Sequence, residues 1–295
     1  METHPDLIRP YPLTQYPRLI INAALTGMVA KRKDSAHVPL SPEEIIEDAA
    51  RCRDAGASIV HLHARDKEEK PAYEKRYYSE IIEGVRDRCP DLIVCASTSG
   101  RVHNTFARRS DVLTLTGRAR PDMASLTLGS LNFPKSASVT DPDMIRQLAE
   151  KMKEAGIVPE LEVFDTSMLY TMKEMIRTGI LTPPFYCNLL LGSVFSTPAT
   201  LFNLACLVKD MPYDTLWAAA GIGIFQLKMN TAAILMGGHV RVGLEDSLYY
   251  DAEKTKPATN PGLVERIARL AKELGREIAT PTEARQMIGL CPATA

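Results

Sequence analysis

The sequence predicts an α/β protein in which one (β/α)8 barrel, also called a TIM barrel, forms a single domain over residues 1–295. Short apolar runs rich in β-branched residues alternate eight times with longer segments of helical period. No linker rich in Gly, Pro or Ser divides the chain. An open doubly wound sheet of eight units would usually show such a break or an insertion, so a closed barrel is favoured.

Eight strands are expected, the first at residues 19–25 and the last at residues 239–245. The other six are expected at residues 58–64, 92–98, 123–129, 158–164, 185–192 and 215–221. Active sites of such barrels lie at the C-terminal ends of the strands. Polar residues that end these runs are therefore the candidates for chemistry.

The first and last helices carry clear start signals. Ser41-Pro42-Glu43-Glu44 supplies a Ser N-cap, a Pro at the first helical position and a Glu two residues further on, and Gly56 ends the helix. In the last crossover helix, apolar residues recur at helical spacing at Leu263, Ile267, Leu270 and Leu274. Thr280-Pro281-Thr282-Glu283 repeats the capping pattern before a short C-terminal helix.

Composition and charge exclude several classes of protein. The 35 Lys and Arg residues balance 36 Asp and Glu residues, so no nucleic-acid partner is expected. The longest apolar stretch, residues 216–227, is shorter than the roughly 18 residues of a membrane span, and residues 1–5 do not begin a signal peptide. We therefore expect a cytoplasmic protein with no membrane contact.

Six cysteines are scattered without a CxxC pair, at Cys52, Cys89, Cys95, Cys187, Cys206 and Cys291. Neither a disulfide framework nor a thiolate metal cluster is expected. Most of these side chains are predicted to be small apolar core residues.

His61 and His63 close the second predicted strand and, being two residues apart, face the same side of the sheet. Two neutral imidazoles are two ligands of a catalytic zinc site, which usually has three protein ligands and an open position. Glu245, at the end of the eighth predicted strand, is a candidate third ligand because only strand one separates strands two and eight. The alternative is a pair of histidines with structural hydrogen bonds and no metal.

Glu160 and Glu162 share one face of the fifth predicted strand. Because burial of an unpaired charge costs several kcal/mol, a cation or basic group is expected beside them. The alternative places both carboxylates at the surface.

Arg241 shares a face with Glu245, and Asp246 follows directly. An Arg beside a metal can bind a carboxylate, and an Asp there can move a proton. The alternative is a structural ion pair at the rim. Ser97-Thr98-Ser99-Gly100, after the third strand, offers hydroxyls and turn amides suited to an anion.

A metallohydrolase of the amidohydrolase type also has an HxH motif, but on the first strand and with further histidines on later strands. Here His4, His37 and His103 lie away from predicted strand ends, and His239 begins strand eight at the opposite face of the barrel. A lyase or acyl-transfer chemistry is favoured over hydrolysis.

Motifs along almost the whole chain resemble the β-keto acid cleavage enzymes, whose best-known branch is the 3-keto-5-aminohexanoate cleavage enzymes of lysine fermentation. The matching segments are Thr26-Gly27, Ser41-Pro42-Glu43-Glu44, Ala55-Gly56-Ala57, residues 61–66, residues 159–165, Ala220-Gly221-Ile222-Gly223 and residues 237–246. The resemblance implies a (β/α)8 barrel, usually a homotetramer. It also implies a Zn²⁺ enzyme that converts a β-keto acid and acetyl-CoA into acetoacetate and a new acyl-CoA.

By the same resemblance, His61, His63 and Glu245 match the zinc ligands. Asp246 and Arg241 match the catalytic pair, with Asp246 as the base that deprotonates the acetyl methyl group. Ser97 and Ser125 match positions that bind the keto acid, and Glu162 matches a polar residue that lines the site.

The chain departs from this pattern in loops over the site. Val29 stands where the aminohexanoate branch has a Glu that binds the substrate ammonium. Ser99, Ile224 and Phe195-Ser196 replace a Gly, an Arg and a Gly-Gly pair. We expect a keto acid without a distal amino group, with an uncharged apolar or hydroxylated end, unless Glu68 or Glu69 supplies a negative charge. Another metal-dependent carbon-carbon lyase, a metallohydrolase barrel and a catalytically silent metal-binding barrel remain alternatives.

Overall fold

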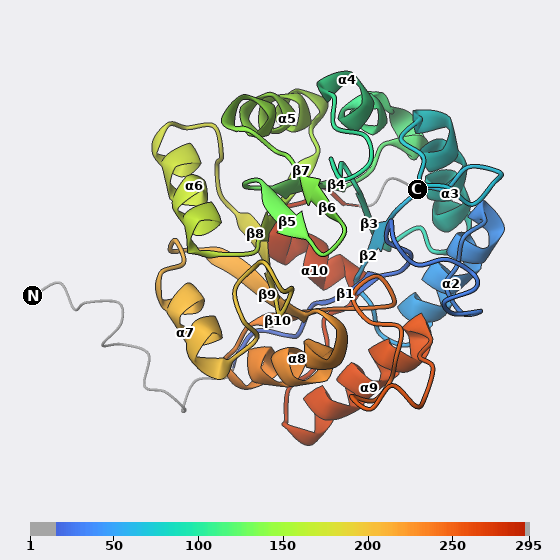
Figure 1. Cartoon of the computed structure of the whole chain (residues 1–295), viewed down its shortest axis with the longest axis vertical. Helices are drawn as coiled ribbons and strands as arrows, with labels where there is room; N and C mark the ends of the chain where they lie inside the picture. Colours follow the sequence, from blue (N-terminus) through green and yellow to red (C-terminus); the bar gives the residue numbers. More distant parts are fainter. Residues whose placement is uncertain (1–15, 293–295) are drawn as a thin grey trace, which may run out of the picture.

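The computed structural model describes residues 16–292, which form a closed barrel of eight parallel strands (Figure 1). Around the barrel the strand order is β1-β10-β9-β8-β7-β4-β3-β2. The strands are β1 (Ile21–Ala24), β2 (Ile59–Leu62), β3 (Ile93–Ala96), β4 (Met123–Thr127), β7 (Val158–Val163), β8 (Phe185–Leu191), β9 (Thr215–Gly221) and β10 (His239–Val242). The predicted (β/α)8 fold is confirmed, and each strand lies within its predicted range.

Helices surround the barrel and cover the outer face of the sheet (Figure 1). They are α2 (Pro42–Asp54), α3 (Lys75–Arg88), α4 (Phe106–Arg109), α5 (Pro142–Ala155), α6 (Thr166–Arg177), α7 (Leu201–Lys209), α8 (Gln226–Leu235) and α9 (Asn260–Glu273). A further helix, α10 (Pro281–Ile288), lies at one end of the barrel. Among these described helices, none is long and apolar enough to cross a membrane. Residues 1–5, including His4, lie outside the described part of the chain.

The predicted helix starts are confirmed in detail. Ser41 and Glu44 form a capping box at the start of α2, with Pro42 at the first position, and Thr280 and Glu283 form a second one at α10. Leu263 and Ile267 are buried on α9, whereas Leu274, predicted on the same apolar face, is 45% exposed because it caps the helix end.

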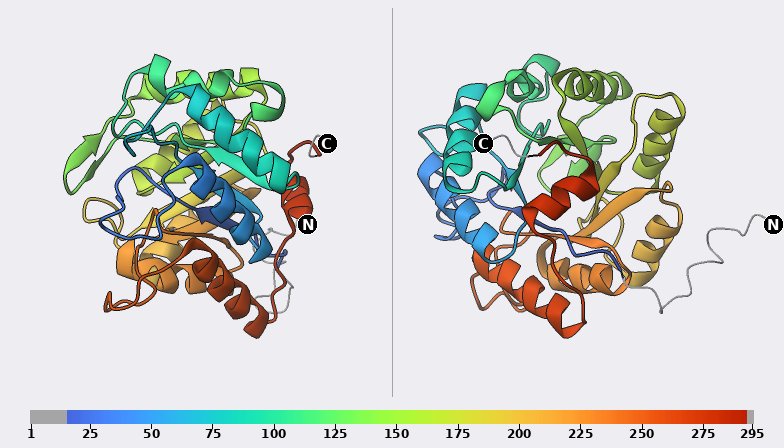
Figure 2. Two further views of the ribbon diagram at one scale, coloured as in Figure 1. Left: turned by 90° about the vertical axis from the view of Figure 1, so that its right-hand side faces the viewer. Right: turned by 180° about the vertical axis from the view of Figure 1, so that it is seen from behind.

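Two apolar cores hold the barrel together. The larger one lies between the outer face of the strands and the helices. The smaller one fills the lower barrel interior with inward-facing residues such as Ile20, Ile59 and Ile93, against Ala284 and Ile288 of α10. Figure 2 shows α10 lying across this end of the barrel. The opposite, C-terminal end is therefore the open one.

One element was not expected from the sequence. Strands β5 (Leu131–Phe133) and β6 (Ser136–Ser138) form an antiparallel hairpin between β4 and α5. It projects over the C-terminal end of the barrel, on the side away from α10 (Figure 2).

Two strand ends differ from the prediction and matter for the site. His63 lies one residue beyond β2, and Glu245 lies three residues beyond β10 rather than at its end. At Gly243 the backbone has φ +159 and passes so close to β1 that a Cβ would lie 2.0 Å from the carbonyl oxygen of Ala24. This close passage ends β10 early, and the Glu245 N–H then donates to that same carbonyl at 3.2 Å.

Candidate active site

The inward-facing residues of the upper barrel are polar and form one connected cluster. Strand β1 pairs with both β10 and β2, and its register places Asn22 beside Arg241 and Ala24 beside His61. Because side chains alternate along a strand, these inward positions meet at the barrel axis. The expectation that only strand one separates the histidines from Glu245 is confirmed.

His61, His63 and Glu245 converge with their ligand atoms facing one another. The two Nε2 atoms are 3.3 Å apart, and His63 Nε2 lies 3.3 Å from Glu245 Oε1. His61 Nε2 lies 3.8 Å from the second oxygen, Oε2, which is buried and has no hydrogen-bond partner among the described residues. Two atoms that each lie about 2.0 Å from a tetrahedral ion are about 3.3 Å apart. The spacing and the unpartnered oxygen fit a metal ion.

Glu160 fixes the orientation of His61. Its Oε2 accepts a hydrogen bond from His61 Nδ1 at 2.6 Å, and its Oε1 accepts one from the Asn22 side-chain amide at 2.5 Å. Both Glu160 and His61 are essentially fully buried. With its Nδ1 proton directed at a carboxylate, His61 in its neutral form presents an unprotonated Nε2 to the ion site, the usual arrangement of a metal-bound histidine.

A second set of potential ligands shares His61 and includes Cys95 and Glu160. In this set the potential ligand atoms already make hydrogen bonds to one another. The Cys95 thiol donates to Glu160 Oε2 at 3.3 Å, and burial and the Glu160 charge raise the pKa of this thiol well above its ordinary value. This deeper set is a hydrogen-bonded network, so the His61, His63 and Glu245 set is the candidate metal centre.

Arg241 is the central cation of the barrel interior and is 1% exposed. It lies 2.9 Å from Glu245, 3.1 Å from Asp246, 3.4 Å from Glu162 and 3.9 Å from Glu160. The expectation of a basic partner for Glu160 and Glu162 is therefore confirmed. Burial lowers the pKa of Arg241, but the surrounding carboxylates raise it well above its ordinary value, so the guanidinium stays charged.

The carboxyl groups around Arg241 differ in the direction of their pKa shifts. Burial raises the pKa of Asp246 above its ordinary value although Arg241 opposes the shift. Burial also raises the pKa of Glu162, again against the effect of Arg241. For Glu160, burial is outweighed by His61 and Arg241, which lower its pKa to about 2. Glu160 is thus a permanent anion, and Asp246 is a stronger base than an ordinary aspartate.

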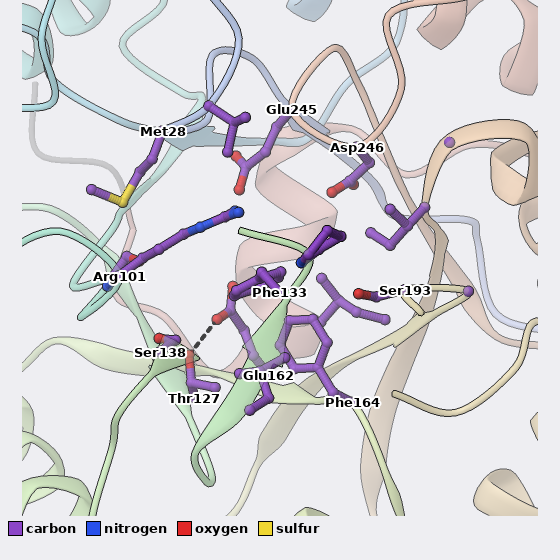
Figure 3. Close-up of a pocket in the computed structure, with 18 of the residues that line it drawn as sticks. Met28, Arg101, Thr127, Phe133, Ser138, Glu162, Phe164, Ser193, Glu245 and Asp246 are labelled. Atoms are coloured by element: carbon purple, nitrogen blue, oxygen red, sulfur yellow. Dashed lines mark hydrogen bonds between the residues drawn. The ribbon is translucent and has the colours of Figure 1, made fainter. Parts of the chain in front are cut away.

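A cavity of about 500 Å³ opens directly above this cluster (Figure 3). His63, Arg241, Glu245 and Asp246 form its floor, and the β5–β6 hairpin forms one wall. Its middle is apolar, with Phe133 and Phe164 packed edge to face at 6.1 Å between ring centroids. The candidate metal centre is therefore accessible from a substrate-sized cavity.

The structure brings most predicted substrate-binding residues to this cavity. Ser97, Val29 and Glu162 line it, and Thr127 donates to the Glu162 carboxylate at 2.7 Å. Ser125 is not among the described lining residues. Its hydroxyl accepts the Thr98 N–H at 3.0 Å, so it supports the loop that carries Ser97.

Five residues that were expected over the site lie outside the described cavity lining, namely Glu68, Glu69, Phe195, Ser196 and Ile224. Phe195 is 56% exposed because a turn, closed by the Ser196 N–H and the Ser193 carbonyl, directs it outward. Phe195, which replaces a Gly over the site, therefore adds no bulk to the described cavity lining. Ile224 is 43% exposed, and Glu69 pairs with Arg32 at 2.9 Å.

Arg101 and Lys135 line the cavity and were not identified from the sequence. Arg101 follows the Ser97-Thr98-Ser99-Gly100 segment directly, so its place after the third strand was the available signal. Lys135 lies in the turn of the hairpin, and no sequence feature had indicated that this turn covers the barrel.

Comparison with known proteins places the chain in one family. The family model described as beta-keto acid cleavage enzyme matches residues 18–290. A protein of Fusobacterium nucleatum subsp. nucleatum, named 3-keto-5-aminohexanoate cleavage enzyme, is 39% identical over 92% of this chain and 98% of its own length. A protein of Cupriavidus necator, named 3-oxoadipate:acetyl-CoA acetyltransferase, is 36% identical over 92% of this chain and 94% of its own length.

Among solved structures, the apo structure of ObcA superposes with a TM-score of 0.79 at 22% identity, covering 87% of this chain and 66% of that chain. This similarity concerns the barrel fold alone. The match to the family model and the similarity to relatives along nearly their whole length show the family as well as the fold. The chain belongs to the family of β-keto acid cleavage enzymes.

Proposed function

We propose that this protein is a zinc-dependent acyltransferase that converts a β-keto acid and acetyl-CoA into acetoacetate and a new acyl-CoA. The observation that carries the proposal is the metal-ligand geometry of His61, His63 and Glu245 beside the buried pair of Arg241 and Asp246. The relatives named above as acetyltransferase and cleavage enzyme support this activity. When bound, zinc supplies Lewis-acid polarisation of a ketone oxygen.

The protein's own residues would prepare both reactants. Ser97 and Ser99 line the cavity beside His63 and offer hydroxyls to the carboxylate of the keto acid. Arg241 holds Asp246 through Nε at 3.1 Å and so directs this carboxylate towards the cavity. Glu160 keeps His61 in the tautomer that binds a metal.

The balance of atoms identifies the proton that Asp246 must remove. Acetoacetate retains the acetyl group of acetyl-CoA and the two terminal carbons of the keto acid. Asp246 therefore takes a proton from the methylene between ketone and carboxylate, rather than from the acetyl methyl group. The carbanion attacks the thioester carbonyl and releases CoA thiolate. The thiolate then attacks the former ketone carbon. Retro-Claisen cleavage releases the new acyl-CoA and leaves the carbanion of acetoacetate, which takes the proton back from Asp246.

The test is acetyl-CoA-dependent formation of acetoacetate by the purified protein, with a panel of β-keto acids and metal content measured on the same sample. We expect one zinc per chain and acetoacetate only when both substrates are present. A metal-loaded protein that forms none with any keto acid would instead support a catalytically silent metal-binding barrel. Turnover without acetyl-CoA would support a different lyase or a hydrolase.

We also propose that the keto acid has no distal amino group. Val29 lines the cavity, and the three carboxylates in the described lining, those of Glu162, Glu245 and Asp246, all contact Arg241. A substrate ammonium would lose its hydration without gaining a free anionic partner, which costs several kcal/mol. We expect the 5-amino keto acid to be a poor substrate.

A homotetramer is the proposed assembly, and a cytoplasmic location remains a prediction. Large apolar side chains are exposed on and before α7, with Val194 77%, Leu201 65% and Phe202 76% exposed. Apolar groups gathered in this way are typical of surfaces that bind another protein. Light scattering during size-exclusion chromatography should give four times the chain mass of 32.6 kDa.

A further inference from the structure

The cations of the cavity fall into two groups with different partners. Arg241, on the floor, lies within 4 Å of four carboxylates. Arg101 and Lys135, on the wall, have no carboxylate within 4 Å among the described residues, although both line the cavity. The cation of the cavity floor is thus in contact with carboxylates, whereas the two cations of the wall have no carboxylate in contact among the described residues.

Arg101 is held in place without a charged partner. Its guanidinium carbon lies 3.9 Å above the centre of the Phe133 ring, and its Nε donates to the Ser136 hydroxyl at 3.4 Å. Both contacts are with the β5–β6 hairpin. Figure 3 shows the side chain reaching into the cavity from the side opposite Ser193. The terminal guanidinium nitrogens have no protein acceptor among the described residues and remain available for a ligand.

The position of these cations relative to the reacting end of the substrate suggests which group they meet. A β-keto acid has its ketone and its C1 carboxylate two bonds apart, so both must lie near His63 and Ser97 on the floor. Arg101 is anchored to the hairpin, and Lys135 lies in its turn, at the outer wall. The described lining also includes the apolar side chains of Phe133, Phe164 and Leu131, against which a chain of methylene groups can pack.

We propose that Arg101 and Lys135 bind a second carboxylate at the distal end of the keto acid, so that the preferred substrates are β-keto dicarboxylates. This inference rests on the proposed function and replaces the uncharged distal group expected from the sequence. That expectation considered Val29 but not the hairpin, which brings two cations to the same cavity. Arginine binds carboxylates through paired hydrogen bonds, and the stacked guanidinium is already ordered for them.

The test compares keto acids of equal length that end in a carboxylate, a carboxamide or an aminomethyl group. We expect kcat/KM to decrease in that order. The carboxamide has the shape of the carboxylate without its charge, so this pair isolates the contribution of the distal charge. A wild-type enzyme that prefers the carboxamide or the amine would overturn the inference and leave the proposed function intact. Absence of acetoacetate with every substrate would instead contradict the proposed function.

The variant Arg101→Gln distinguishes the distal carboxylate from the C1 carboxylate that all β-keto acids share. We expect it to lower kcat/KM by roughly 10- to 100-fold for the dicarboxylate and to leave the carboxamide nearly unchanged, since a charged hydrogen-bonding partner is lost for the first substrate alone. An equal loss for both substrates would place Arg101 at C1 and overturn the inference.

Two further variants keep the result interpretable if Arg101→Gln affects folding. Lys135→Gln, in an exposed turn, should lower kcat/KM for the dicarboxylate selectively and by a smaller factor. Lys33→Gln removes an exposed cation outside the described cavity lining and should change neither substrate. If Lys33→Gln and Lys135→Gln have the same effect, general electrostatic attraction explains the preference and the proposed contact is wrong.

Discussion

At the scale of single residues, burial and neighbouring charges determine what each group in the site can do. His61 and His63 are two residues apart, and both are buried. Burial lowers the pKa of His61, but Glu160 and Glu245 outweigh this effect and raise it to about 8. For His63, burial is the larger effect and keeps the pKa below its ordinary value. Identical side chains therefore differ because only His61 has a second, buried carboxylate on its other nitrogen.

His63→Ala should remove most of the bound metal, because two donors remain where three converge. Metal content by mass spectrometry should fall from one ion per chain to roughly a tenth of that. His37→Ala, at an exposed histidine, is the matched control and should retain the metal. Full metal content in His63→Ala would mean that the ion binds elsewhere.

Asp246→Asn should separate metal binding from turnover. The amide has the shape of the carboxylate and leaves His61, His63 and Glu245 in place, but it cannot accept the substrate proton. Acetoacetate formation should fall by roughly 10²- to 10⁴-fold while metal content is unchanged. A rate close to that of the unmodified enzyme would exclude Asp246 as the base.

At the scale of elements, the turn after β10 positions Glu245. Gly243 passes against the backbone of Ala24, and Gly27, after β1, leaves room for Glu245, whose Cγ would lie 2.8 Å from a Cβ at that position. The sequence predicted that this strand delivers Glu245 to the site. It did not predict that the strand ends at Val242, because the contact with Ala24 forms only between neighbouring strands.

Gly243→Ala should weaken metal binding by roughly tenfold or more, because a Cβ 2.0 Å from a main-chain oxygen forces β1 and the Glu245 turn apart. Gly117→Ala is the control. Gly117 also has a positive φ, of +58, but a Cβ there meets nothing within 4 Å. Both variants place a side chain at a positive φ, and only Gly243→Ala adds a clash with the main chain. Competition with a chelator measures the affinity, and equal affinities in both variants would contradict this role of Gly243.

At the scale of the whole molecule, the closed end of the barrel contains a histidine that should make the fold sensitive to acid. His239 begins β10, and its Nδ1 accepts the Ile20 N–H at 3.0 Å. Burial and the nearby Arg276 lower the pKa of His239 to about 3, against about 6.5 in an unfolded chain. Its neutral form is the one that fits the folded barrel.

Because the folded-state pKa is the lower one, this contribution to stability is complete above pH 6.5 and is lost as the pH falls towards 3. At pH 5 the loss should be about 2 kcal/mol of the free energy of unfolding. In His239→Asn, the side-chain oxygen can still accept the Ile20 N–H but does not titrate, so the decrease between pH 7 and pH 5 should be smaller. Urea unfolding at both pH values measures it. Equal decreases in both proteins would rule out this role for His239.

The sequence by itself determined the eight-fold alternation, the capped helices, the residues of the candidate metal centre and the neighbouring pair of Arg241 and Asp246. These features depend on local patterns: the period of apolar residues, capping motifs, and the alternation that places His61 and His63 on one face. The expected strand order placed Glu245 beside these histidines, because consecutive parallel strands in a barrel are neighbours.

Only the tertiary structure decided the character of the cavity wall. Phe195 turns outward, Ser125 supports a loop, and the β5–β6 hairpin brings Arg101 and Lys135 over the barrel. None of these outcomes follows from a repeating pattern, because each depends on contacts between loops that are far apart in the chain. The strand sequences therefore determine which residues form the cavity floor, while the choice of substrate depends on how the loops pack above them.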